Sequence, residues 1–535
     1  MTCEGAMVED IVCVPAGYNV PVIIRGTERS EYYSLVDTTR IRIVLVQGKA
    51  YIAGFIAELA SRKFHPTITI ADIDIERHVI QASNSLAPSR CCEFLHVSRM
   101  APKSGSSNSS KKQSIIYCEG SPTWNPDTYL VDSALHARAS AHLAQNDLKS
   151  AIETSFSLRK TDTYVYHAMV AVTLPQVQQV VSLGRAHGLH SWYYGEPSKV
   201  EVEPESQPPA PPVLPPPPQS DIEAYLTIFN PSYAAATALK NFTSNAKKGS
   251  LRLETGTYLT SKRYIHPSLS TLSKLPRAKP SRPVPANPYL TFLSWTIRNL
   301  EWTGPNLSSA RGRPSSHHIL PVLMHHFGCV CPSHEALEIL RLLADSREII
   351  DVGSGNGYWT RMLRDYHTFH AQDTPKSKSN PLPPITPVDS AQSSWRTNWV
   401  SDTLIADGAA YLRETRTGAK DAVLLLVYPI VGGGVAGGSE GGFTRCMLDA
   451  YDGDTVAVVG TQNHNGYTGF RNMTMDEFMA REHRDEWVKV VQVPLPSFPG
   501  KDEALYVFQR GARAPPRVQT ESSTQETIDK AKENT

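Results

Sequence analysis

The stretch Glu348-Ile-Ile-Asp-Val-Gly-Ser-Gly-Asn-Gly-Tyr358 decides the fold of the C-terminal half of this chain. A short apolar run ends at Asp351, and glycines follow at positions 353, 355 and 357, before a helical pattern begins. Glycine has no Cβ, so such a turn can adopt positive φ and let a ligand approach its backbone, with helix N–H groups pointing at it. The order strand, glycine-rich turn, helix therefore predicts a nucleotide-binding turn in a sheet of parallel strands.

The spacing of the glycines separates two classes of ligand. Dinucleotide-binding folds use G-x-G-x-x-G, which seats a pyrophosphate on the helix N-terminus, but position 358 of this chain is tyrosine. The pattern here, D-x-G-x-G-x-G, resembles the first motif of class I S-adenosylmethionine-dependent methyltransferases. The resemblance implies that the turn passes under the methionine part of S-adenosylmethionine, and that the cofactor-binding residues are Asp351, Gly353, Ser354, Gly355, Gly357 and Tyr358. A glycine-rich turn without a ligand is the alternative.

A second carboxylate follows the apolar run 384–388. A carboxylate at the tip of the second strand can accept hydrogen bonds from both ribose hydroxyls, and the resemblance gives this role to Asp389. A polar insertion at 367–381 makes the interval from the glycines longer than the usual spacing of about 20 residues. Asp373, inside that insertion, is the alternative carboxylate, and no apolar strand precedes it.

A third short strand, 403–406, ends at Asp407 and Gly408. A carboxylate can accept a hydrogen bond from an exocyclic amine, and the resemblance implies that this pair meets the adenine amino group. A solvent-exposed loop aspartate is the alternative.

The candidate catalytic residues are Tyr428 and His464. The run 421–427 is the most continuous apolar segment of the chain, which predicts a central strand covered on both faces, and Tyr428 stands at its tip. In the family this tip faces the transferred methyl group. His464 follows the next predicted strand and has the pKa range for base catalysis, although a hydrogen-bonded surface histidine is equally compatible with the pattern. Nearby, Asn465 and Tyr467 could orient a polar acceptor.

The acceptor is not identified by any motif. The fourth strand lacks the Asn-Pro-Pro-Tyr run that the family uses for amino groups of bases and of glutamine. Methyl transfer from a sulfonium needs alignment and desolvation, and needs a base only where the acceptor must lose a proton.

The strand and helix patterns predict a doubly wound α/β domain over residues 288–511, with seven strands. Segments 487–493 and 503–509 are joined by a proline-rich turn, so they are expected to form an antiparallel pair at the edge of the sheet. A reversed last strand is typical of the methyltransferase form, and the resemblance covers about 315–511.

A proline-rich segment divides the remainder of the chain into an N-terminal module and a linker. Nine prolines fall between Pro204 and Pro218, and the whole of 201–287 is predicted to be a largely disordered linker, followed at the far end by a disordered tail at 512–535. A separate α/β or α+β module of unknown role is expected over 10–200. Its predicted elements are strands at 40–46, 67–71, 164–172 and 190–194 and helices at 51–59 and 174–189.

One part of this N-terminal module has a distant similarity of its own. Residues 164–199 are similar to the closing half of class-two peptidyl-tRNA hydrolases, but the lysine-rich loop of those enzymes is not identifiable and Gly195-Glu196 replaces an aspartate-glycine turn. The default interpretation is a substrate-selecting or partner-binding module.

Composition excludes several classes of partner. Lys+Arg 53 against Asp+Glu 52 gives a net charge of +1, so overall charge does not indicate nucleic acid or an anionic membrane. The eight irregularly spaced cysteines fit a reducing compartment, and no apolar run approaches the roughly 20 residues that span a bilayer. We expect a cytoplasmic or nuclear protein, whose N-terminal region or proline-rich segment is open to a protein partner.

No metal site is expected. His325, His326, Cys329, Cys331 and His334 are zinc-type ligands, but their spacing lacks a second Cys or His pair. The sequence thus favours a methyltransferase with an unidentified acceptor. A nicotinamide-dependent oxidoreductase and a non-catalytic binding scaffold are the alternatives.

Overall fold

The computed structural model describes the following residues: 11–13, 22–26, 33–36, 115–117, 123–167, 171–195, 212–311, 316–371, 382–390, 397–429, 440–464, 469–470 and 472–517. The chain separates into two compact units, Met1–Lys111 and Lys112–Thr535. In the first unit, β1 (Ile11–Cys13), β2 (Val22–Gly26) and β3 (Tyr33–Val36) form an antiparallel sheet in that order. The elements predicted at 40–46, 51–59 and 67–71 lie outside the described residues.

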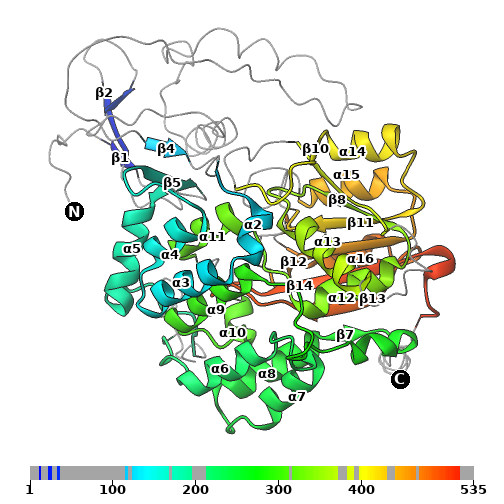
Figure 1. Cartoon of the computed structure of the whole chain (residues 1–535), viewed down its shortest axis with the longest axis horizontal. Helices are drawn as coiled ribbons and strands as arrows, with labels where there is room; N and C mark the ends of the chain where they lie inside the picture. The colour runs from blue at the N-terminus through cyan, green and yellow to red at the C-terminus, as the bar shows by residue number, and fades with distance from the viewer. Residues whose placement is uncertain are drawn as a thin grey trace, which may run out of the picture. The chain divides into compact units, whose positions relative to one another are not determined.

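The second unit contains an eight-stranded sheet with the order β10-β9-β8-β11-β12-β14-β13-β7 (Figure 1). Its strands are β8 (Glu348–Val352), β9 (Ile385–Asp389), β10 (Leu404–Ile405), β11 (Ala422–Val427), β12 (Thr455–Thr461), β13 (Val488–Pro494), β14 (Glu503–Gln509) and β7 (Tyr264–Ile265). The five strands from β10 to β12 are parallel, and β14 runs antiparallel to both of its neighbours.

The last two strands pair antiparallel as predicted, but their position differs from the expectation. Strand β14 lies inside the sheet, between β12 and β13, and β7 covers the outer side of β13. Every residue of β14 is buried, which suits an internal strand with two covered faces. The sheet therefore has one strand more than the seven predicted, because β7 comes from the segment assigned to the linker.

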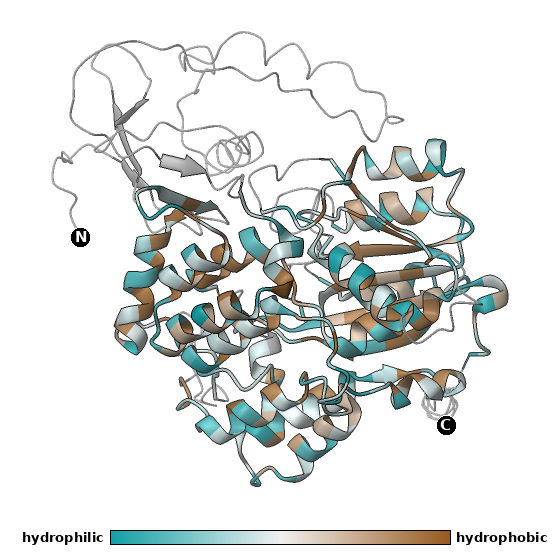
Figure 2. Ribbon diagram, viewed as in Figure 1, coloured by the Kyte–Doolittle hydropathy of each residue, from teal (hydrophilic) through white to brown (hydrophobic). Residues whose placement is uncertain are grey.

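Alternate residues of the central strands enter two separate cores. Ile349, Leu425 and Val459 belong to one hydrophobic cluster, whereas Ile350 and Leu424 belong to the other. This follows from the two-residue period of a strand, which directs successive side chains to opposite faces. Both sets are apolar because helices cover both faces, and the central strands are mainly brown in Figure 2.

Different helices supply the two cores. The first core includes α12 (His334–Ala344) and α13 (Tyr358–Ala371), and the second includes α14 (Gly408–Ala410), the π-helical turn η6 (Tyr411–Thr415), α15 (Gly442–Ala450) and α16 (Met475–Glu482). Ser333 caps the start of α12, since its side chain accepts a hydrogen bond from the backbone N–H of Ala336.

A helical layer precedes the sheet and shares the first core. Its elements are α2 (Pro126–Val131), α3 (Ser133–Ala144), α4 (Leu148–Ser155), α5 (Leu174–Leu183), η3 (Gly184–His187), α6 (Gln219–Thr227), α7 (Ala235–Ser244), α8 (Leu251–Lys262), η4 (Pro267–Lys274), α9 (Pro288–Asn299), α10 (Leu307–Arg311) and α11 (Ile319–Phe327). A short helix, η8 (Gly511–Arg513), follows β14. Among the described helices, none is long and apolar enough to cross a membrane.

The linker predicted over 201–287 is folded in large part. Helices α6, α7 and α8 bury Tyr225, Phe242 and Leu259 in the same core as the sheet. The apolar residues of these helices are separated by many polar ones, so the sequence pattern is weak, and burial against α9 and the sheet stabilises the helices instead. The boundary between the compact units also falls near residue 111, and not near 200.

A small sheet stands beside this helical layer. Strands β4 (Ile115–Tyr117) and β5 (Thr163–His167) are parallel, and β6 (Ala171–Thr173) runs antiparallel to β5. The single strand predicted over 164–172 is therefore two paired strands. The strand predicted at 190–194 is an extended segment with one bridge, Tyr194 to Val213.

Candidate cofactor site at the glycine-rich turn

The glycine-rich turn connects β8 to α13 with an unusual backbone. Gly353, Gly355 and Gly357 have φ of 76°, 57° and 77°, in the left-handed region that residues with a Cβ rarely adopt. The backbone N–H groups of Gly353 and Ser354 both donate to the carbonyl of Val388 on β9, at 2.8 and 3.1 Å. Hydrogen bonds within the protein thus fix the turn to the neighbouring strand β9.

Two glycines of the site are required by close packing. A Cβ on Gly357 would lie 2.3 Å from Cγ2 of Val400, and a Cβ on Gly408 would lie 2.4 Å from Cγ1 of Val352. Gly353 is less restricted, because its nearest neighbour would be Cζ of Phe443 at 3.4 Å. Gly357 and Gly408 therefore bring the segments after β9 and β10 close against the turn.

Asp351 lies fully buried beneath the turn. Its Oδ2 accepts a hydrogen bond of 2.7 Å from the Thr360 hydroxyl. Burial dominates and raises the pKa of Asp351 to about 7; the bond from Thr360 opposes this shift, and the nearby Asp389 carboxylate adds to it.

Three buried polar atoms of this segment have no hydrogen-bond partner among the described residues: Asp351 Oδ1, Ser354 Oγ and Asn356 Nδ2. Buried polar groups are usually paired, so three such atoms within six residues mark a place where a polar ligand would satisfy them.

Asp389 stands at the end of β9 and contacts the turn directly. Its Oδ2 accepts a hydrogen bond of 2.9 Å from the backbone N–H of Gly355. Asp407 follows β10 and is exposed, and its carboxylate caps α14 by accepting from the N–H of Ala410 at 2.9 Å. Asp389 is thus the last residue of its strand and Asp407 follows the end of its own, and both lie on the carboxyl edge of the sheet.

The Tyr358 side chain is directed into the helical layer. Its hydroxyl donates to Oδ1 of Asn287 at 2.7 Å and accepts from the backbone N–H of Tyr289 at 3.1 Å. Asn287 is the N-cap of α9, so Tyr358 joins the start of α13 to the start of α9.

Tyr428 follows β11 and has a left-handed backbone, with φ of 56°. A tyrosine in this conformation is strained, and such strain is held only where the surroundings fix it. The Tyr428 ring is buried, its hydroxyl accepts a hydrogen bond of 2.8 Å from Lys501 Nζ, and that ammonium also lies 4.6 Å from the ring centroid. Lys501 Nζ is in addition 3.6 Å from Oε1 of Glu503.

The Lys501 group extends into a buried polar cluster at the start of β14, next to the tip of β12. Asp502 accepts from the hydroxyl of Tyr258 on α8, and from Nε2 of Gln462 at 2.8 Å. Burial raises the pKa of Asp502 to about 6 and that of Glu503 to about 7. We did not predict this cluster; the signal for it was three consecutive charged residues, 501–503, directly before an apolar strand.

His464 lies away from this cluster, on the surface. Its Nε2 is 2.9 Å from Oε2 of Glu477, and both side chains are half exposed. Glu477 also closes the capping box of α16 with Thr474, so His464 is attached to the start of that helix. Asn465 and Tyr467 lie outside the described residues, as do 391–396 and 430–439.

His326 and His334, two of the zinc-type residues between 325 and 334, bond to separate groups. His326 bonds the hydroxyls of Tyr166 and Thr397 at 2.9 and 2.8 Å, and burial lowers its pKa to about 3. Burial raises the pKa of Cys331, and His334 bonds Tyr366. This segment packs beside the glycine-rich turn, since Trp359 donates to the carbonyl of Val330 at 2.9 Å.

A cleft of about 330 Å³ lies elsewhere, between the segment 275–284 that follows η4, the start of α12 and the end of α13. Arg277, Lys279 and Arg282 line it with Phe369 and His370. It shares no lining residue with the turn, so it is a separate feature of the surface.

Comparisons with known proteins give distant matches only. No protein-family model and no curated protein matches the sequence. Among solved structures, the chain is similar to the 1,6-didemethyltoxoflavin-N1-methyltransferase of Burkholderia thailandensis with S-adenosylhomocysteine bound, at 13% identity and a TM-score of 0.22, over 33% of this chain and 77% of that one. It is also similar to the O-methyltransferase TomG of Streptomyces achromogenes in complex with SAM, at 13% identity and a TM-score of 0.22, over 48% and 99%. At these values neither protein's activity transfers to this chain.

Proposed function

We propose that residues 288–511, which supply seven of the eight strands of the sheet, form an S-adenosylmethionine-dependent methyltransferase domain with an unidentified acceptor. One observation carries the proposal: the glycine-rich turn with its unpaired polar atoms follows β8, the strand at which the sheet order reverses. Strands β9 and β10 lie on one side of β8, and β11 and β12 on the other. In open α/β sheets, ligands bind outside the carboxyl ends of the strands at such a switch point.

The residues around the turn fit this cofactor by chemistry. Gly353 and Gly355 let a ligand approach the backbone, and Asp351 Oδ1 is a buried oxygen that could pair with an ammonium group. Asp389 would accept the ribose hydroxyls, and Asp407 with Gly408 would lie at the adenine. When bound, the cofactor supplies a methyl group on a positively charged sulfur, an electrophile that needs an aligned nucleophile.

A diphosphate fits the turn less well. The N–H groups of Gly353, Ser354 and Gly355 already donate to Val388 and Asp389, so few donors remain for phosphate oxygens. The Asp389 carboxylate would also repel a diphosphate at this position. These contacts favour the sulfonium nucleoside over a nicotinamide dinucleotide.

Tyr428 is the proposed residue next to the methyl-transfer position, because it stands at the tip of the central strand β11. Lys501 donates to its hydroxyl, and this fixes the orientation of the ring. His464 is retained as a proposed base for acceptors that must lose a proton, with Glu477 orienting its imidazole.

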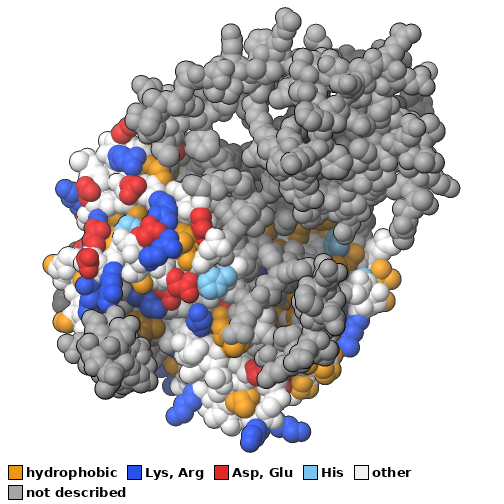
Figure 3. Space-filling model, turned by 180° about the vertical axis from the view of Figure 1, so that it is seen from behind, with side chains coloured by type: hydrophobic (Ala, Val, Ile, Leu, Met, Phe, Trp, Pro, Cys, Tyr) orange, Lys and Arg blue, Asp and Glu red, His pale blue; other side chains and the backbone are white. Residues whose placement is uncertain are grey.

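We assign no chemical class to the methyl acceptor. On the face that Figure 3 shows, positive and negative side chains are interspersed among the described residues, so no single-sign surface points to nucleic acid. We also propose a protein partner for the N-terminal region, and its identity is likewise not assigned.

The test is calorimetric titration of the full chain with S-adenosylhomocysteine and, separately, with NAD. We expect micromolar binding of S-adenosylhomocysteine alone, lost in Gly355→Val. Gly249→Val is the matched control, because Gly249 also has positive φ but nothing lies within 4 Å of its added Cβ. Preferential NAD binding would replace the proposal with an oxidoreductase, and binding of neither ligand by a folded chain would leave a scaffold.

A further inference from the structure

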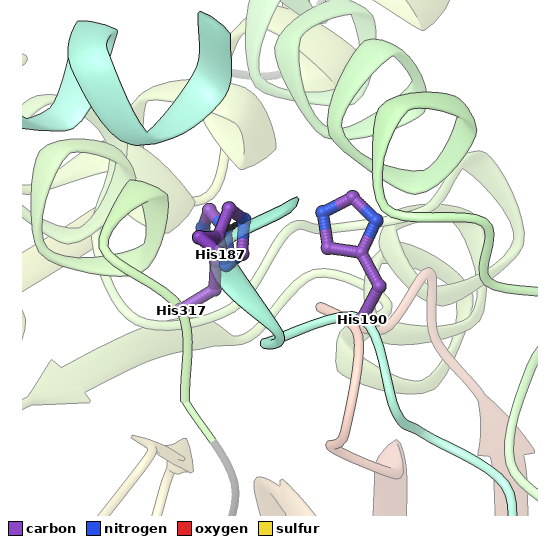
Figure 4. A group of neighbouring side chains, drawn as sticks. All are labelled: His187, His190 and His317. Atoms are coloured by element: carbon purple, nitrogen blue, oxygen red, sulfur yellow. Dashed lines mark hydrogen bonds between the residues drawn. The ribbon is translucent and has the colours of Figure 1, made fainter. Parts of the chain in front are cut away.

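Three histidines from two distant segments meet in the helical layer. His187 ends η3, His190 follows three residues later, and His317 lies just before α11. One ring nitrogen of each lies within 4.8 Å of those of the other two. Figure 4 shows a nitrogen of the His190 ring directed towards the other two rings.

We propose that His187, His190 and His317 form a binding site for a divalent transition metal of the zinc type, independent of the cofactor site. Three imidazoles that leave one coordination position open are a common ligand set for Zn²⁺. We expected no metal site from the sequence, and this set gives no sequence signal, because His190 and His317 are 127 positions apart and no ligand spacing connects them.

The geometry of the first pair matches a metal site. Nε2 of His187 and Nε2 of His317 are 3.2 Å apart. Two nitrogens bound tetrahedrally to zinc at about 2.0–2.1 Å would be roughly 3.3–3.4 Å apart. The third nitrogen lies within 4.8 Å of the other two and would have to move closer to complete the set.

The third histidine lacks the partners that a structural histidine would have. The His190 side chain is 8% exposed, and neither of its ring nitrogens makes a hydrogen bond with the described residues. Buried polar groups are rarely left in this state, and a metal ion would satisfy one of the two nitrogens.

The Glu301 carboxylate lies beside Nδ1 of His190, where it could orient the imidazole as a metal ligand. Oε2 of Glu301 is 3.7 Å from Nδ1 of His190, and Arg185 holds the Glu301 carboxylate in a bidentate pair. Metal-binding histidines commonly donate their second N–H to such a carboxylate, which fixes the ring and makes it a stronger ligand.

Protonation also favours metal binding at neutral pH. Burial lowers the pKa of all three histidines, and the neighbouring histidines lower that of His317 further, to about 3. Neutral imidazole is the form that binds a metal. Nδ1 of both His187 and His317 accepts from a backbone N–H, and their Nε2 atoms are 3.2 Å apart, so two neutral rings cannot satisfy all three contacts at once.

Metal binding through Nε2 would break two hydrogen bonds of the histidine rings. Nδ1 of His187 accepts from the backbone N–H of Leu189 at 3.1 Å, and Nδ1 of His317 accepts from that of Ile319 at 3.2 Å. Both contacts are lost when the rings bind a metal through Nε2. We therefore expect micromolar rather than nanomolar affinity.

The test uses the full chain stripped of metal with a chelator. Calorimetry with ZnCl₂ is expected to give one site per chain, and Co²⁺ is expected to give visible absorption bands of a low-coordinate nitrogen site. His190→Ala and His187→Gln should each weaken Zn²⁺ binding at least tenfold. S-adenosylhomocysteine binding and the thermal unfolding midpoint would check that both variants fold.

The control is His142→Ala, which removes a histidine of α3 that is not in the group and should leave Zn²⁺ affinity unchanged. Absence of stoichiometric Zn²⁺ binding, or binding that survives both variants, would overturn the site. Because the cofactor turn shares no residue with it, loss of metal binding with intact S-adenosylhomocysteine binding would concern this inference alone.

Discussion

The Asp389 carboxylate accepts a hydrogen bond from the backbone N–H of Gly355, 34 residues earlier in the chain, at 2.9 Å. This contact connects the end of β9 to the turn after β8 across the switch point of the sheet. It brings the predicted glycine-rich turn and the predicted ribose-binding carboxylate into direct contact.

Asp389→Asn tests whether this carboxylate binds the cofactor. The amide oxygen can still accept from Gly355, so the turn should keep its conformation, while the charge that accepts ribose hydroxyls is removed. A hydrogen bond to a charged group contributes about 1.5–3 kcal/mol, so S-adenosylhomocysteine affinity should fall by about 10- to 100-fold in calorimetry. Asp421→Asn, at an exposed position before β11, should bind as the wild type does. Equal affinities for all three proteins would remove Asp389 from the site.

Gly357→Ala tests the packing of the turn against the segment after β9. The new Cβ would lie 2.3 Å from Val400 in a backbone with φ of 77°. Gly249→Ala has nearly the same φ, 75°, but open space around its Cβ. Urea unfolding should show a loss of about 1–2 kcal/mol for Gly249→Ala from backbone strain alone, and about 2–5 kcal/mol for Gly357→Ala. Similar losses in the two variants would mean that Val400 moves aside.

Most elements of the sheet could be predicted from local pattern. The strands from β8 to β14 and the cap of α12 depend on residues close in sequence, such as alternating apolar positions and Ser333 three residues before the N–H that it caps. The helices within residues 219–262 could not be predicted from the sequence. They contain few apolar side chains, and only packing against distant elements buries these.

Side-chain direction was the part of the site that the sequence could not determine. Tyr358 is next to the last glycine of the turn, yet its hydroxyl bonds Asn287, 71 residues earlier. Tyr428 meets Lys501, 73 residues later. Such pairs depend on which helices pack over which strand ends, and neither periodicity nor motif spacing contains that information.

Asp351→Asn should change how stability depends on pH. Burial raises the pKa of Asp351 from 3.8 to about 7, so the folded state keeps this proton where the unfolded chain has lost it. The folded state then binds more protons between about pH 4 and 7, and the free energy of unfolding contributed by Asp351 falls as pH rises through this window.

The asparagine variant does not titrate, so wild type should lose stability relative to Asp351→Asn by roughly 2–4 kcal/mol from pH 4 to pH 8. Urea unfolding of both proteins at several pH values measures the difference between their free energies of unfolding. The contributions of the other titrating groups cancel in this difference. Asp449→Asn, exposed on α15, is the control and should show a flat difference. A flat difference for Asp351→Asn as well would show that its carboxyl ionises normally in the folded protein.

Tyr428→Phe separates two roles for the tyrosine at the tip of β11. The change keeps the ring and removes the oxygen that accepts from Lys501 at 2.8 Å, so the free energy of unfolding should fall by about 1–2 kcal/mol. Tyr506→Phe is a matched control, because the buried Tyr506 hydroxyl has no hydrogen-bond partner among the described residues and its removal should be neutral or stabilising. S-adenosylhomocysteine affinity should stay within about twofold in both variants, since a residue beside the transferred methyl group contacts little of a product that lacks it. A large loss of affinity in Tyr428→Phe with unchanged stability would instead place its hydroxyl on the cofactor, and would require the ring to leave Lys501 when the ligand binds.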